Sequence, residues 1–126
     1  MNISINKVNQ VFFSCFIFLL LISQTLAQNT VSDSMLLSTD EVNTQLQALP
    51  QWTTDGKTIS RTFKFKNFVA AVNFVNQIVE PAESAGHHPD LEISYNKVTV
   101  NLTTHDAGGL TAKDFSLAEE ISEIAK

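Results

Sequence analysis

The stretch Asp90–Leu102, "DLEISYNKVTVNL", decides the fold because two alternating patterns meet in it. Apolar and polar residues alternate with a period of two on both sides of "NK", as they do in strands that bury one face. The apolar members are Leu91, Ile93, Tyr95, Val98, Val100 and Leu102. The stretch therefore predicts a β-hairpin with one buried face and one polar face.

The loop of this hairpin sets its register. If Asn96 and Lys97 are the two loop residues, every apolar residue of the first strand faces an apolar residue of the second, and a shift by one residue destroys that agreement. The expected pairs are Tyr95–Val98, Ile93–Val100 and Leu91–Leu102. Continued outward, the same register places His88 opposite His105, so we expect these two side chains to be close.

Signals on the N-terminal side predict a helix and another hairpin. "STDE" at 38–41 is a capping box, and it predicts a helix from about Thr39 to Leu49 that Pro50 ends. "DG" at 55–56 is a strong hairpin signal between strands expected at 52–54 and 57–66.

Two more helices flank the hairpin Asp90–Leu102. Asn67 predicts the start of a helix that Pro81 kinks near Val79 and that closes at Gly86. Its expected buried stripe is Phe68, Val72, Val75 and Val79, widened by Ala71 and Phe74. Thr111 and Asp114 predict the cap of a last amphipathic helix. The order α-β-β-α-β-β-α predicts an α+β fold, in which a four-stranded antiparallel sheet carries three helices on one face.

The first 27 residues have the pattern of a secretory signal peptide. Lys7 precedes the apolar run Val11–Ile22, and "SQTLA" ends at Ala27. We therefore expect a signal peptide at 1–27, a flexible lead-in at 28–37 and one domain at 38–126, exported to the periplasm or secreted. An uncleaved anchor, or a wrong start codon before a cytoplasmic protein, are the alternatives.

Composition excludes several classes of function. The chain has 8 Lys and Arg against 13 Asp and Glu, without a basic cluster, so nucleic-acid binding is not expected. Its single cysteine, Cys15, lies inside the expected leader. A domain without that segment has no disulfide, thiolate nucleophile or cysteine zinc site, and no membrane attachment is expected after cleavage.

All three histidines fall in two short segments, His87 and His88 in "ESAGHHP" and His105 in "THDAGG". Their convergence, with Glu83 at a helix end and Asp114 at the next helix start, suits general acid/base catalysis. A polar loop without chemistry is one alternative, and a zinc site is another. Adjacent histidines on an extended segment point to opposite faces, which disfavours one metal shared by His87 and His88.

These residues resemble the signature of the pterin-4a-carbinolamine dehydratase family. The similarity covers about residues 35 to 126 and rests on Glu83, "HHP" at 87–89, Tyr95, His105 and Asp114 at family spacing. It extends through "FKFKNFVAAVNFV" at 63–75 and "AGHHPDLEISYNKVTVNLTTHDAGGLTAKDFSLAEEI" at 85–121. The resemblance implies an α+β hydro-lyase, without cofactor or metal, that removes water from a 4a-hydroxytetrahydropterin and recycles the cofactor of aromatic amino acid hydroxylases.

The resemblance also implies the site residues and partners. The catalytic residues are expected to be His87, His88, His105 and Asp114. Glu83, Pro89, Thr104 and Asp106 are expected to bind or orient the pterin. A homodimer or homotetramer is expected.

Two features depart from the family pattern, namely Pro81 within a helix and the leader of a family that is usually intracellular. An exported, non-catalytic binding or dimerisation module of the same fold is therefore the alternative function.

Overall fold

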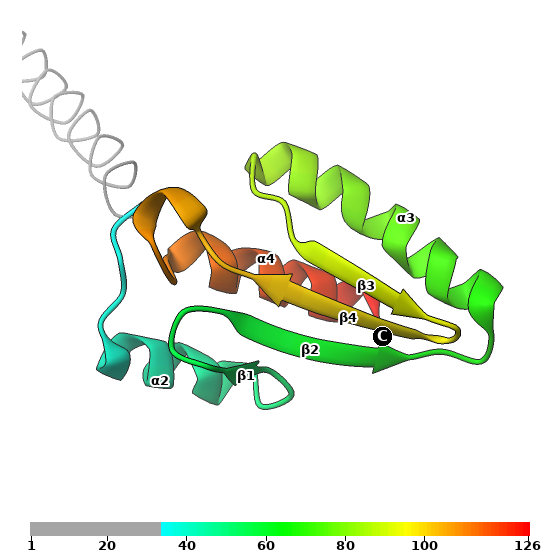
Figure 1. Ribbon diagram of the computed structural model, residues 1–126, viewed down its shortest axis with the longest axis horizontal. Helices are drawn as coiled ribbons and strands as arrows, with labels where there is room; N and C mark the ends of the chain where they lie inside the picture. Colours follow the sequence, from blue (N-terminus) through cyan, green and yellow to red (C-terminus); the bar gives the residue numbers. More distant parts are fainter. Residues whose placement is uncertain (1–33) are drawn as a thin grey trace, which may run out of the picture. The chain divides into compact units, whose positions relative to one another are not determined.

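The computed structural model describes residues 34–126, so the expected leader at 1–27 and the first part of the lead-in lie outside the described residues. The elements are α2 (Thr39–Ala48), β1 (Thr53–Thr54), β2 (Ile59–Lys64), α3 (Phe68–Ala85), β3 (Asp90–Ser94), β4 (Lys97–Leu102), the 3-10 turn η1 (His105–Ala107) and α4 (Ala112–Ile124). This order confirms the predicted α-β-β-α-β-β-α fold (Figure 1).

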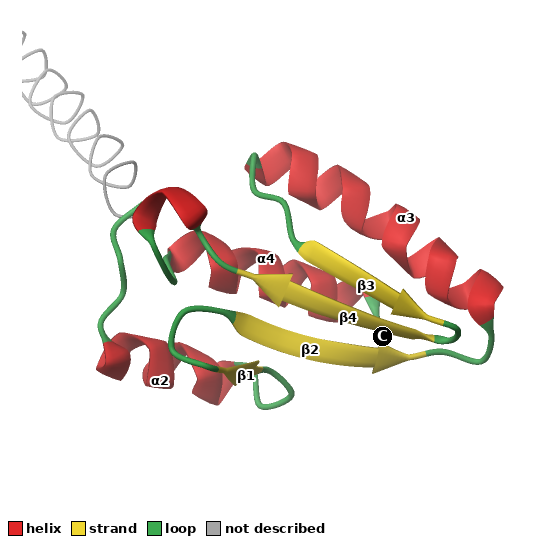
Figure 2. Ribbon diagram, in the orientation of Figure 1, coloured by secondary structure: helices red, strands yellow, loops and turns green. Residues whose placement is uncertain are grey.

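The four strands form one antiparallel sheet in the order β1-β2-β4-β3, and its members stand out in Figure 2. The apolar residues of β2 and β4 share the face that the three helices cover. The buried members there are Ile59, Phe63, Val98, Val100 and Leu102, which pack with Val42 of α2, Phe74 of α3 and Phe115 of α4. The other face is polar, with hydroxyl and amide pairs such as Thr62–Thr99 and Ser60–Asn101.

The predicted caps are present. Ser38 begins α2 with a capping box, in which the Glu41 carboxylate accepts the Ser38 backbone N–H at 2.8 Å. Asn67 accepts the N–H of Ala70 at the start of α3, which continues through Pro81 and ends at Gly86 in the left-handed conformation. At the end of the expected lead-in, the backbone N–H of Leu37 donates to the carbonyl of Leu110 at 2.8 Å.

The register predicted for the second hairpin is wrong by two residues. Leu91 pairs with Val100 and Ile93 with Val98, so the loop is Tyr95–Asn96. Asn96 fixes that loop, because its backbone carbonyl accepts the N–H of Phe65 at 2.8 Å and its side-chain amide donates to the Phe65 carbonyl at 2.6 Å. A shift of two keeps each side chain on its predicted face, but it removes the expected opposition of His88 and His105.

The expected burial of the first strand of that hairpin is also wrong. Leu91, Ile93 and Tyr95 are 37%, 41% and 68% exposed. β3 is the edge strand, and Tyr95 lies in the loop with φ of 51°. The side chains on the helix-covered face of β3 therefore lie at the rim of the core.

In α3 the prediction is right for Ala71 and Phe74, but the centre of the buried stripe lies one residue away from the predicted valines. Ala71, Phe74, Ile78, Pro81 and Ala82 are buried, whereas Phe68 and Val79 are more than half exposed. The helix carries two adjacent apolar stripes, and only one of them can face the sheet. Of the second stripe, Val75 is partly buried against the core, whereas Phe68 and Val79 lie on the outer side of the helix.

In the part of the chain from 34 to 126, none of the helices has the length and apolar character that crossing a membrane requires.

Candidate active site

The fold brings the three histidines to one end of the sheet. The link between α3 and β3 carries His87 and His88, and β4 leads directly into η1, which begins with His105. Because β3 and β4 are antiparallel, β3 begins where β4 ends (Figure 1). The predicted convergence of the two histidine segments is therefore present, although not through opposed positions of a ladder.

His87 forms the buried part of the site. Its Nε2 lies 2.7 Å from Oδ1 of Asp114, and only 9% of His87 is exposed. Gly86, with φ of 56°, turns the chain at the end of α3, and the backbone N–H of His87 donates to the carbonyl of Ala82. This turn directs His87 toward the start of α4.

Asp114 is fully buried, and it is held from a second side. Its Oδ2 accepts the backbone N–H of Thr111 at 2.8 Å and the hydroxyl of Thr104 at 2.8 Å. The hydroxyl of Thr111 lies 2.8 Å from that of Thr104 and can donate to it. The carboxylate thus accepts from two segments while it faces His87, which fixes its position.

The second ring nitrogen of His87, Nδ1, is accessible at the surface of the site. Among residues 34–126, Nδ1 has no hydrogen-bond partner. In the same residues every buried side-chain nitrogen or oxygen atom has a partner, so an atom without one is not buried. Nδ1 therefore reaches the surface of the site. When Nε2–H donates to Asp114, a neutral imidazole presents the lone pair of Nδ1 outward.

The other two histidines are exposed, and each lies beside its own carboxylate. Nε2 of His88 is 2.9 Å from Oε1 of Glu83, on the last turn of α3. Nε2 of His105 is 4.0 Å from Oδ2 of Asp90, the first residue of β3. Three histidine–carboxylate pairs thus surround the end of the sheet, one buried and two open to solvent.

The remaining residues expected at the site have different places. Thr104 lies behind Asp114 as one of its donors, Pro89 joins His88 to β3, and Asp106 is exposed on η1. Sequence reasoning missed two neighbours of the site, Asp90 and the hydroxyl of Thr111. Thr111 had a signal as the expected helix cap, whereas the proximity of Asp90 to His105 follows only from the observed register.

In the described part of the chain, no three His, Cys, Asp or Glu side chains converge in a way that holds a metal ion. The histidines are distributed over separate carboxylates, and Nε2 of His87 is occupied by Asp114.

Comparisons with known proteins identify the family of the chain. The family model described as pterin 4 alpha carbinolamine dehydratase matches residues 35–124. The chain belongs to this family. The match includes every residue of the three histidine–carboxylate pairs.

Several relatives are similar over the whole domain. A protein of Cyanothece sp. named "Putative pterin-4-alpha-carbinolamine dehydratase" is 59% identical over 93 residues, which are 74% of this chain and 96% of that protein. A protein of the same name from Nostoc sp. is 60% identical over 91 residues, 72% of this chain and 98% of the relative. The crystal structure of a transcriptional coactivator/pterin dehydratase from Brucella melitensis has a TM-score of 0.68 at 40% identity, covering 71% of this chain and 98% of that one.

Proposed function

We propose that the protein dehydrates 4a-hydroxytetrahydropterin to the quinonoid dihydropterin by histidine acid/base catalysis, and so takes part in recycling tetrahydrobiopterin or a related pterin. Membership of the dehydratase family supports the substrate class. The observation that carries the proposal is the set of three histidine–carboxylate pairs at one end of the sheet. A dehydration needs one proton given and one proton taken, and histidine is suited to both near neutral pH.

The proposed steps balance with proton transfers alone. His88 and His105 act around the hydroxyl on C4a, and one of them, as imidazolium, gives a proton to the departing oxygen. The C4a–O bond breaks and water leaves. Nδ1 of His87 takes a proton from a ring nitrogen of the pterin, whose electron pair forms the new double bond. The sum is loss of one water, so the proposal assigns no metal or redox cofactor.

Carboxylates set the orientation of the imidazoles in this proposal. Asp114 holds the Nε2 side of His87, so that Nδ1 faces the substrate. Glu83 orients His88 from the end of α3. Pro89 and Asp106, which border His88 and His105 along the chain, help to place the pterin ring.

We also propose that the chain forms a homodimer or homotetramer. Leu91 and Ile93 on the edge strand, and Phe68 and Val79 on the outer stripe of α3, are exposed apolar residues. An open edge strand with apolar side chains is suited to pairing with a second copy. Sedimentation of the wild type and of Ile93→Lys tests this, and a wild type that is monomeric at all concentrations contradicts it.

Export of the protein is a further part of the proposal, and its basis is the basic start and apolar run of residues 1–27. N-terminal sequencing of the protein from its own cells is expected to begin at Gln28. An intact Met1 contradicts cleavage.

The deciding experiment adds the purified protein to freshly generated 4a-hydroxytetrahydropterin and follows dehydration by absorbance. We expect acceleration over the spontaneous rate, and a loss of about 100-fold or more in His88→Ala or His105→Ala. Glu83→Gln is expected to lower the rate less, and Glu92→Gln, which removes an exposed carboxylate from β3, is the matched control. No acceleration by the wild type contradicts the enzyme and leaves the non-catalytic binding module as the function.

A further inference from the structure

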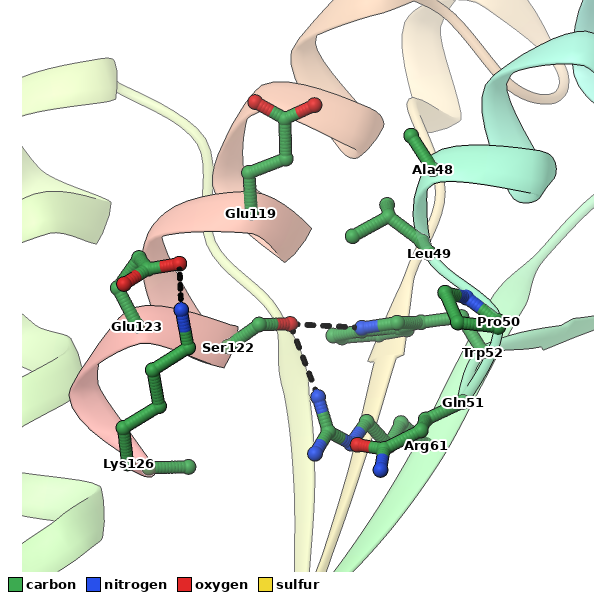
Figure 3. Close-up of a pocket in the computed structure, with 11 residues that line it drawn as sticks. Ala48, Leu49, Pro50, Gln51, Trp52, Arg61, Glu119, Ser122, Glu123 and Lys126 are labelled. Carbon is green, nitrogen blue, oxygen red and sulfur yellow. Dashed lines mark hydrogen bonds and ion pairs between the residues drawn. The ribbon is translucent and has the colours of Figure 1, made fainter.

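A hollow of about 630 Å³ lies between the end of α2 and the last turns of α4. Its volume is within the range of small-molecule sites. None of its lining residues belongs to the three histidine–carboxylate pairs. Figure 3 shows its walls, with Leu49 and Trp52 on one side and Glu119, Ser122 and Glu123 of α4 on the other.

Arg61 closes one end of this hollow, and its position is unusual. It lies between Ile59 and Phe63 on the face of β2 that the helices cover, where its neighbour on β4, Val100, is fully buried. Its guanidinium carbon is 4.1 Å from the centre of the Phe63 ring. The sheet thus places a charged group at the margin of its own core.

The guanidinium is fixed in place but has no carboxylate partner. Nη1 donates to the hydroxyl of Ser122 at 3.0 Å, and among residues 34–126 no acidic group lies within ion-pair distance of Arg61. Ser122 is itself held, since it also accepts Nε1–H of Trp52 at 3.0 Å (Figure 3). Its own hydroxyl donates to the Ala118 carbonyl.

Among residues 34–126 only Nη1 of Arg61 donates a side-chain hydrogen bond to another residue, so the other guanidinium donors are without a protein acceptor at the hollow that Arg61 lines. Burial lowers the pKa of Arg61, which reflects the cost of removing water from its charge. A carboxylate from a ligand offsets that cost through a charge-assisted, two-pronged hydrogen bond.

The acidic side chains of Glu119 and Glu123 on the opposite wall of the hollow affect which kind of anion binds best. Glu119 has no ion-pair partner among the described residues, whereas Glu123 is paired with Lys126. A negative charge at Glu119 repels a doubly charged phosphate more than a singly charged carboxylate. The side chains of Leu49 and Ala125 offer apolar contact for the body of a ligand.

We propose that this hollow binds a small monocarboxylate with an apolar body, and that Arg61 holds the carboxylate. The site is separate from the pterin chemistry, so it stands whether or not the protein is a dehydratase.

Trp52 is the only tryptophan of the chain, which makes it a built-in probe of the hollow. Its fluorescence, and the NMR shift of its indole N–H, are followed in the full chain at low salt during titration with 4-methylpentanoate. We expect saturable binding with Kd on the order of 1 mM, as for other ligands of this size. The neutral isostere 4-methylpentanamide and inorganic phosphate are expected to bind at least about tenfold more weakly.

Three variants test the assignment. Arg61→Gln is expected to weaken binding at least about tenfold, and Glu119→Gln to strengthen it about twofold because it removes repulsion. Lys64→Gln, on the polar face of the same strand, is the control and is expected to change nothing. Since Glu119 is exposed, its variant keeps the test decisive even if Arg61→Gln does not fold. Equal binding of the amide, no saturation, or weaker binding by Glu119→Gln overturns the proposal.

Discussion

His87 and Asp114 are 27 positions apart in the chain, and yet Nε2 of His87 lies 2.7 Å from Oδ1 of a carboxylate that is fully buried. This contact ties the link after α3 to the start of α4. It connects the stability of the domain to the orientation of an expected catalytic group.

Asp114→Ala is expected to lower both stability and activity. The substitution leaves His87 and the backbone N–H of Thr111 without their acceptor, which costs about 2–4 kcal/mol of unfolding free energy. Asp114→Asn keeps the shape and is expected to be less destabilised, while its dehydration rate falls at least about tenfold because the imidazole loses its carboxylate. Urea denaturation and the dehydration assay measure the two effects. Wild-type rates in Asp114→Asn contradict the proposed orienting role.

Thr104→Val tests whether the support of Asp114 matters for the reaction. Valine has nearly the same shape but cannot donate to Oδ2 of Asp114, so we expect kcat to fall about tenfold to 100-fold with little change in KM. Thr104→Ser restores the hydroxyl and is expected to recover most of the rate. Thr99→Val, the same change on the polar face of β4, is the control. Equal kcat in the valine and serine variants at position 104 removes Thr104 from this role.

Tyr95→Asn is expected to stabilise the protein. Tyr95 has φ of 51° in the loop between β3 and β4 and is 68% exposed, so it bears backbone strain and contributes little packing. Asparagine tolerates this conformation better, and we expect a gain of about 0.5–1 kcal/mol in unfolding free energy. The same substitution at Ser94, which is in a strand, is the control and is expected to be neutral or destabilising. A less stable Tyr95→Asn would mean that the tyrosine ring matters more than the strain.

Stability is expected to fall in acid, in part through Glu41 and Asp55. Hydrogen bonds from Ser38 lower the pKa of Glu41, and the backbone N–H groups of Lys57 and Thr58 lower the pKa of Asp55. A carboxyl group whose pKa is lower in the folded state stabilises the fold at any pH above its pKa in the unfolded chain. That unfolded pKa is 4.5 for Glu41 and 3.8 for Asp55. The stabilisation is lost as the pH falls through the lower pKa of the folded state. We expect the urea midpoint to decline less between about pH 5 and pH 3 in a Glu41→Gln and Asp55→Asn double variant than in Glu92→Gln. Identical slopes contradict the assignment.

Alternation along the strands was sufficient to predict the faces of the second hairpin, but not its register. Registers that differ by two residues place the same side chains on the same face, so the pattern cannot separate them. The observed register depends on the two hydrogen bonds between Asn96 and Phe65, which are 31 residues apart in the chain. For the same reason the expected opposition of His88 and His105 was wrong, although their presence at one end of the sheet was predicted.

The helix caps were predictable because a capping box involves only four consecutive residues, as at Ser38–Glu41. The buried stripe of α3 was predicted only in part, through Ala71 and Phe74, because the helix carries two adjacent apolar stripes and only the tertiary fold chooses between them. At the site, Glu83 beside His88 was predictable from the helix end, whereas Asp90 beside His105 depended on the register.

The separation of His87 and Asp114 along the chain also has a consequence for the order of folding. Each hairpin and helix can begin to form from neighbouring residues, but this contact closes a long loop and is expected to appear only when α3, the β3–β4 hairpin and α4 have docked. Refolding followed by dehydration activity is therefore expected to lag behind refolding followed by helix content. A newly made chain would become a catalyst in its last step, after its secondary structure is complete.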